Sequence, residues 1–203
     1  GSMKITILLH STTGNTKTVT RYGASYLRSL GHECEVVDIV KNPEPPSLEG
    51  VDLLGVACPV MYWRPTFTME RYIARIENAP HGGKPAFILE TCGGMPGASF
   101  EIIGNLMVNK GWIPIGGHWV IAPSNWPVHI VGLESMAMTE PLSAVRHVTP
   151  RSLRPLWALF WESGAMPDEQ DRDGLLSFMR AMTDRAGEGR LDRAPAPRSL
   201  HHP

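Results

Sequence analysis

The 203-residue sequence contains little cysteine, little net charge and no long apolar run. Its three cysteines are too few and too scattered for a disulfide framework, which favours a cytoplasmic protein. The 19 basic residues nearly balance the 20 acidic ones, so the net charge is −1 and the basic face of a nucleic-acid-binding protein is missing. No apolar run is long enough to span a bilayer, so we expect no membrane-spanning segment.

The usual catalytic and metal-binding motifs are also missing. There is no Cys-x-x-Cys run, no His-x-x-x-His spacing, no nucleophile elbow, no Walker loop and no dinucleotide fingerprint. We therefore expect no metal site and assign no catalytic residue. His118 and His129 flank the end of an expected strand; they are interpreted as structural or surface residues, with proton donation to a substrate as the alternative.

Apolar, β-branched runs alternate with helical segments along the first 122 residues. The expected strands are 4–9, 33–40, 51–58, 84–91 and 115–122, and the expected helices are 15–30, 66–77 and 99–110, with a final helix at 171–185 beside the first strand. This alternation predicts an α/β fold, a doubly wound five-stranded parallel sheet in the order 2-1-3-4-5. Ligands of such sheets bind beyond the carboxyl ends of the first and third strands.

The chain is organised around the loop that follows the first strand, which consists of Ser11, Thr12, Thr13, Gly14, Asn15 and Thr16. A helix that starts here directs its first unpaired N–H groups and the positive end of its dipole toward the loop. Four hydroxyl groups add donors, and Gly14 lets the backbone approach a ligand closely. The loop therefore suits a phosphate monoester, while an ordinary hydroxyl-rich helix cap is the alternative interpretation.

This hexapeptide resembles the phosphate loop of flavodoxins, which holds the phosphate of FMN. Two later stretches resemble the other flavin loops of that family, most closely those of the flavodoxin domain in two-domain flavodoxin–ferredoxin proteins. The resemblance covers residues 4–125 and implies a flavodoxin-like fold with FMN as the cofactor. The residues it assigns to the cofactor, beyond the first loop, are Pro59, Val60, Met61, Tyr62, Trp63 and Arg64, then Thr91, Cys92, Gly93, Gly94 and Gly97, and finally Asn125.

The second loop carries two adjacent aromatic residues, Tyr62 and Trp63. They are expected to stack on a flat ring, and packing on the following helix is the alternative. Trp63 stands where the family has a glycine whose peptide bonds flavin N5. Because tryptophan resists positive φ, we do not expect Trp63 to adopt the glycine conformation, or the stable neutral semiquinone of the family to carry over. Arg64 either places a cation near the ring or pairs with Glu70 on the surface.

Cys58 and Cys92 end neighbouring strands in the predicted order. We interpret them as small buried residues, and a redox-active dithiol is the alternative. Because the chain has no Cys-x-x-Cys run, an iron–sulfur cluster would have to come from a partner.

The remaining residues predict a single domain at 3–187, an insertion at 123–168 and a disordered tail at 188–203. The insertion is aromatic in part, and three interpretations stay open: it covers its own domain, it forms a dimer or partner interface, or it lies on a membrane surface. The tail is rich in arginine, proline, alanine and glycine, a composition typical of disorder.

The resemblance implies an FMN-binding electron-transfer protein whose partner is another redox protein, with an iron–sulfur protein or a flavin reductase as the expected classes. An FMN-dependent reductase of a quinone or another small acceptor is the alternative, favoured by the low net charge. A binding module that has lost the flavin is the third hypothesis, and the intact first loop argues against it. Replacing Thr13 with aspartate should expel FMN by repulsion of its phosphate.

Overall fold

The computed structural model describes residues 1–12, 14–93, 96–122 and 169–195. Its centre is a parallel sheet in the order β2-β1-β3-β5-β6. These strands are β1 (Lys4–Leu9), β2 (Glu33–Asp38), β3 (Leu53–Met61), β5 (Lys84–Cys92) and β6 (Trp112–Ile121). Counted along the chain, this is the predicted order, so the doubly wound α/β fold is confirmed.

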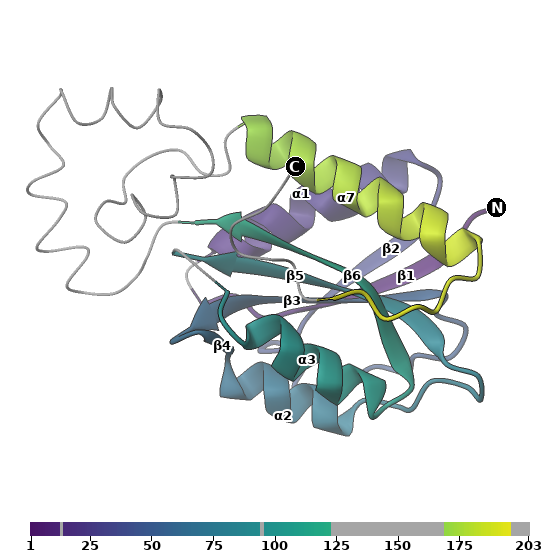
Figure 1. Ribbon diagram of the computed structural model, residues 1–203, viewed down its shortest axis with the longest axis horizontal. Helices are drawn as coiled ribbons and strands as arrows, with labels where there is room; N and C mark the ends of the chain where they lie inside the picture. The colour runs from purple at the N-terminus through teal and green to yellow at the C-terminus, as the bar shows by residue number, and fades with distance from the viewer. Residues whose placement is uncertain (13, 94–95, 123–168, 196–203) are drawn as a thin grey trace, which may run out of the picture.

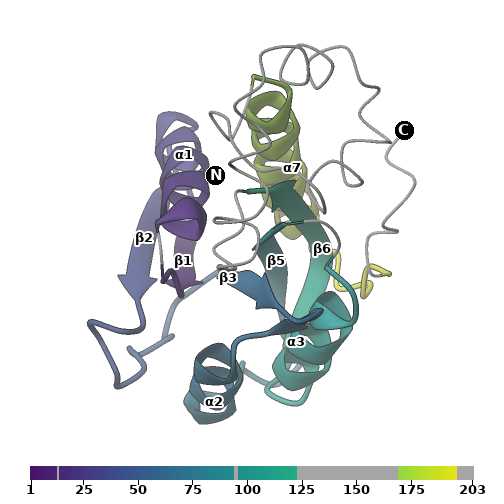
Figure 2. The same ribbon diagram turned by 90° about the vertical axis from the view of Figure 1, so that its left-hand side faces the viewer.

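Helices cover both faces of the sheet (Figures 1 and 2). One layer contains α1 (Asn15–Ser29) and α7 (Glu169–Gly187), and the other contains α2 (Phe67–Arg75) and α3 (Ser99–Val108). Residue Gly31 has a φ of 87° directly after α1, a conformation that glycine adopts at little cost where a helix ends. The Thr66 hydroxyl caps α2 by accepting a hydrogen bond from the Met69 N–H.

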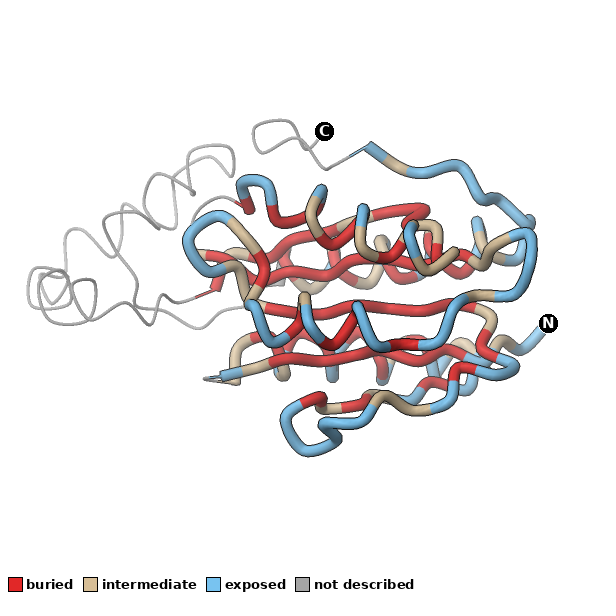
Figure 3. Tube along the Cα trace, turned by 90° about the horizontal axis from the view of Figure 1, so that it is seen from below, coloured by how far each residue is buried: buried red, intermediate tan, exposed pale blue. Residues whose placement is uncertain are grey.

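Apolar side chains on both faces of the strands make the core, which Figure 3 shows as a buried centre between the two helix layers. Leu8, Val56 and Ile88 pack under α2 and α3, while Ile7 and Phe87 pack under α1 and α7. Burial on both faces explains why these strands read as nearly continuous apolar runs. The final helix packs against α1 and β6, farther across the sheet than the predicted place beside β1.

Four strands differ from the expected boundaries: β2 ends earlier, at Asp38, β5 ends one residue later, at Cys92, and β3 and β6 differ more. β3 continues to Met61 and turns back into a short antiparallel strand, β4 (Arg64–Pro65), so part of the predicted second loop is a hairpin. The two prolines that flank this stretch had indicated irregular backbone. β6 begins at Trp112 because a bulge at Ile115 absorbs one extra residue: Pro114 pairs with Ala86, and Gly116 pairs with Phe87.

The C-terminal segment differs from the expected disorder in its described part, residues 188–195. The Ala194 N–H donates to the Pro114 carbonyl at 2.9 Å, and Arg193 donates to the side chain of Asn105 at 2.7 Å. These bonds hold the segment against β6 and α3. The predicted insertion at 123–168 lies outside the described residues. Among the helices that are described, none is long and apolar enough to cross a membrane.

Candidate functional site

The first predicted loop joins the carboxyl end of β1 to α1. The Ser11 hydroxyl oxygen accepts hydrogen bonds from the N–H groups of Gly14, at 3.2 Å, and Lys17, at 3.3 Å. Gly14 has a φ of 104°, and no atom lies within 4 Å of the place where a Cβ would stand. The first turn of α1 contains no acidic residue, so no carboxylate there would repel a phosphate. Thr12 is exposed, and Thr13 lies outside the described residues.

A buried hydrogen bond joins the first loop to the third. Thr16, in the first turn of α1, and Thr91, near the end of β5, have hydroxyl oxygens 2.8 Å apart. Both side chains are buried. The Thr16 hydroxyl therefore links two loops, whereas the sequence had suggested that it points toward the ligand. Its neighbour Asn15 begins α1, as expected.

The second loop is a two-residue turn between β3 and β4. Tyr62 and Trp63 occupy its centre, with φ values of 52° and 62°. Positive φ at both central positions is the arrangement of a type I′ hairpin turn, which usually contains Asn-Gly or Gly-Gly. The expectation that Trp63 would not adopt the glycine conformation is wrong. The pairing of Met61 with Arg64 closes the hairpin and imposes this backbone.

The aromatic rings of the turn are turned outward. Tyr62 is 75% exposed and Trp63 is 59% exposed, so neither packs into the core or under α2. Met61 and Phe67 are also exposed beside them. Aromatic residues held in strained backbone at the surface are typical of ligand sites, because a fold tolerates such strain where the local structure serves a function.

Arg64 adopts the second of its two expected roles. Its guanidinium donates to both carboxylate oxygens of Glu70, at 2.9 and 3.2 Å, and lies over the Phe67 ring. Partly exposed bidentate ion pairs between arginine and a carboxylate fix the relative position of the two side chains more than they add stability. Arg64 therefore anchors the base of the hairpin to α2.

The third loop lies directly against the second. The Ala98 N–H donates to the carbonyl oxygen of Trp63 at 3.0 Å, and Gly97, with a φ of 58°, touches the Trp63 backbone. Cys92 is buried and Gly93 is half-buried at the start of this loop. Of the remaining predicted site residues, Gly94 and Asn125 lie outside the described residues.

A histidine that the sequence analysis did not select connects the first loop to the second. His10 is buried at the end of β1, and its Nδ1 lies 2.8 Å from the hydroxyl oxygen of Thr66. Burial lowers the pKa of His10, and the carboxylate of Asp38 partly opposes this. The sequence feature that could have identified His10 is its position, because a titratable residue stands there between an apolar strand and a ligand loop. All three loops are thus linked in pairs.

The cysteines agree with the interpretation as buried structural residues. Cys58 and Cys92 lie on the adjacent strands β3 and β5, but Cys58 is in register with Glu90, two positions before Cys92. Burial raises the pKa of the Cys58 thiol well above its ordinary value, and nearby Glu90 adds to the effect. A dithiol active at neutral pH is therefore disfavoured. His118 stacks on Phe178 of α7, which supports its structural role.

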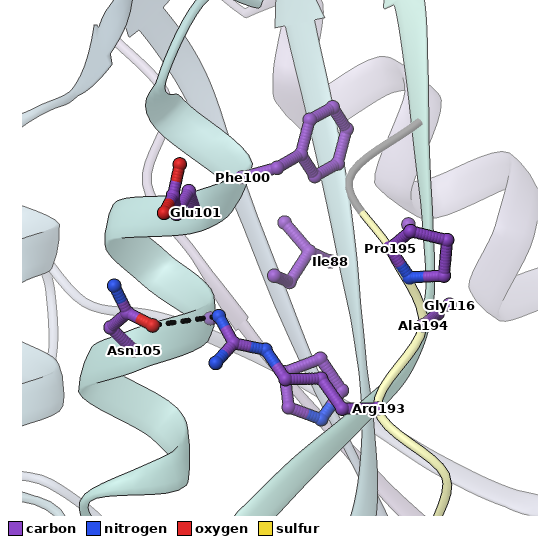
Figure 4. Close-up of a pocket in the computed structure, with 11 residues that line it drawn as sticks. Ile88, Phe100, Glu101, Asn105, Gly116, Arg193, Ala194 and Pro195 are labelled. Atoms are coloured by element: carbon purple, nitrogen blue, oxygen red, sulfur yellow. Dashed lines mark hydrogen bonds between the residues drawn. The ribbon is translucent and has the colours of Figure 1, made fainter. Parts of the chain in front are cut away.

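A pocket of about 440 Å³ lies apart from these loops, between α3, β6 and the C-terminal segment (Figure 4). Its floor is Ile88 and Phe100, and the Arg193 guanidinium crosses it to reach Asn105. Of the predicted cofactor-binding residues that the structure describes, none lines this pocket. Among the described residues, no group of three or more His, Cys, Asp or Glu side chains is placed to hold a metal ion.

No protein-family model matches the sequence, and no curated protein matches it. Solved structures do match. Flavodoxin 1 from Bacillus cereus superposes with a TM-score of 0.57 and 16% identity, covering 89% of this chain and 97% of that one. A flavodoxin from the domain Archaea gives a TM-score of 0.53 and 13% identity, covering 91% and 98%.

The chain has the flavodoxin-like fold. A larger enzyme contains the same fold as one part: rubredoxin oxygen:oxidoreductase from Desulfovibrio gigas matches with a TM-score of 0.54 and 12% identity, covering 91% of this chain but 36% of that protein. At identities this low the likeness establishes the fold alone, and function has to be argued from the site.

Proposed function

We propose that this flavodoxin-like chain binds FMN and passes electrons to or from a protein redox partner. The observation that carries the proposal is the pairwise linkage of the three loops: Thr16 with Thr91, Trp63 with Gly97, and His10 with Thr66. They meet at the carboxyl ends of β1, β3 and β5, where ligands of doubly wound sheets bind. The solved flavodoxins with the same fold add support.

Each loop offers the chemistry that one part of FMN requires. The N-terminus of α1, with Ser11 and Gly14, would hold the phosphate. The outward rings of Tyr62 and Trp63 would cover the flat ring system, and backbone N–H groups of the glycine-rich third loop would meet its carbonyl oxygens. FMN itself supplies the electron-transfer chemistry when bound.

The test is a titration of the purified chain with FMN, followed by the quenching of flavin fluorescence. Saturable binding of one FMN per chain is expected. Thr13→Asp should weaken binding at least tenfold, about 1.4 kcal/mol, because it places a carboxylate beside the phosphate. Asn109→Asp, which adds the same charge at the far end of α3, is the control and should bind FMN like the wild type. Absence of binding by the wild-type chain would refute the proposal.

A reductase of a quinone or another small acceptor is the second candidate. It is favoured by the net charge of −1, since electron shuttles that find partners by electrostatic attraction are usually strongly charged. Steady-state oxidation of NAD(P)H by the FMN-loaded chain in the presence of a quinone separates the two proposals. Sustained turnover would favour the reductase, and electron exchange only with reduced proteins would favour the shuttle.

A further inference from the structure

Glu90 is completely buried although it carries a carboxyl group. It lies on β5 between Leu89 and Thr91, on the face of the sheet covered by α2 and α3. One carboxyl oxygen accepts a hydrogen bond from the hydroxyl of Ser99, the first residue of α3. The other, Oε2, has no hydrogen-bond partner among the described residues. An ionised carboxylate is costly in such a place, whereas a protonated one is tolerated.

Glu90 belongs to a buried polar row that crosses three strands. Cys58 of β3 stands in register with Glu90, and the backbone N–H of Thr66 lies close enough to the Cys58 sulfur to oppose the rise of its pKa. The Thr66 hydroxyl then meets the imidazole of His10 at the end of β1. The row therefore runs from His10 through Thr66 and Cys58 to Glu90 and Ser99, beneath the N-terminal ends of α2 and α3.

Four residues of this row stand next to, or within a few residues of, a loop of the proposed FMN site in the sequence. His10 precedes Ser11, Thr66 follows the hairpin turn, and Glu90 precedes Thr91. Ser99 begins the helix just after Gly97. A change of charge on a cofactor held by these loops would therefore act on Glu90 at short range through protein with little water, where electrostatic effects are strongest.

We propose that Glu90 is a redox-linked proton site, which takes up a proton when electrons arrive on the bound FMN and releases it when they leave. This rests on the proposed function. The electrons come from the reduced partner protein, or from dithionite in the test, and the proton comes from water. The proton binds the carboxylate of Glu90, which becomes a neutral acid and offsets the added negative charge.

The surroundings of Glu90 support this assignment. Burial raises the pKa of Glu90 to about 8, and the bond from Ser99 opposes that rise. The facing groups are the Cys58 thiol on β3, Trp119 in register on β6 and the Ser99 hydroxyl on α3. Glu70 of α2, which is paired with Arg64, acts on Cys58. None of these is a cation beside Glu90 that would hold its carboxylate ionised.

The experiment is a reduced-minus-oxidised infrared difference spectrum of the FMN-loaded chain near pH 8, where Glu90 is partly ionised. The wild type should gain a carbonyl band of a protonated carboxylic acid on reduction, with uptake of a fraction of one proton reported by an indicator dye. Glu90→Gln should lose both signals. Glu101→Gln, which removes an exposed carboxylate from α3, the helix that also contains Ser99, is the matched control and should keep them.

Ser99→Ala provides a second measurement that does not depend on the folding of the Glu90 variant. The Ser99 hydroxyl stabilises the ionised carboxylate, so its removal should move the infrared signal to higher pH. Difference spectra that are identical in the wild type and Glu90→Gln, or a Ser99→Ala signal with unchanged pH dependence, would overturn the assignment while FMN binding stands. A chain that takes up no FMN would instead overturn the proposed function together with this inference.

Discussion

The backbones of Gly97 and Trp63 lie so close together that residue 97 has no room for a side chain. A Cβ added to Gly97 would stand 2.8 Å from the carbonyl oxygen of Trp63. The two residues belong to different loops, after β5 and β3 respectively, and the adjacent hydrogen bond from the Ala98 N–H to Trp63 fixes the same contact. The second and third loops therefore depend on a glycine at position 97.

Gly97→Ala should separate these loops. The variant combines the strain of a positive φ with overlap against Trp63, so we expect a loss of about 2–4 kcal/mol in the free energy of unfolding and at least tenfold weaker FMN binding. Urea denaturation and FMN titration measure the two effects. Gly50→Ala is the control, because Gly50 has a φ of 71° with no atom near its Cβ position. It should lose only about 1 kcal/mol and keep FMN affinity. Equal effects of the two substitutions would contradict the proposed contact.

We expect the Tyr62–Trp63 turn to lower the free energy of unfolding while it raises the affinity for FMN. Replacing it with Asn-Gly gives the sequence that a type I′ turn prefers, so the free energy of unfolding should rise by about 1–2 kcal/mol as the strain disappears. FMN affinity should fall at least tenfold because the exposed rings are lost. Thermal unfolding of the apoprotein and FMN titration are the measurements. An Asn-Gly variant that binds FMN like the wild type would show that neither ring contacts the cofactor.

Ser11 is expected to organise the phosphate loop before any ligand binds. Its hydroxyl oxygen already accepts hydrogen bonds from the N–H groups of Gly14 and Lys17. Ser11→Ala leaves those donors without this acceptor and should lower the free energy of unfolding by about 1 kcal/mol, with weaker FMN binding. Ser29→Ala makes the same chemical change near the other end of α1, where the hydroxyl is exposed, and should leave FMN affinity unchanged. A Ser11→Ala variant with normal affinity would remove Ser11 from the phosphate site.

Much of the fold could be predicted because its signals are local. The apolar runs of β1 and β3 and the loop from Ser11 to Thr16 carry their own patterns of burial and turn chemistry. The backbone of Trp63 could not be predicted in this way, since its φ follows from the pairing of Met61 with Arg64 and not from its own preference. The burial of Glu90 is equally non-local, because it depends on Ser99 and on the helix layer above β5. The C-terminal segment reads as disordered until β6 and α3 supply hydrogen-bond partners for Ala194 and Arg193.

The raised pKa of Glu90 makes stability depend on pH in a defined window. Burial moves this pKa from 4.5 to about 8, so between these values the folded chain holds a proton that the unfolded chain has released. The stability that this group contributes is therefore complete at low pH and falls as the pH rises through the window. Above about pH 8 it is lost, and the total loss is up to about 5 kcal/mol.

Glu90→Gln cannot ionise and should lack this decline. Urea denaturation of the apoproteins between these pH values should give a falling curve for the wild type and for Glu101→Gln, and a flatter one for Glu90→Gln. Parallel curves for all three would mean that Glu90 is ionised in the folded protein.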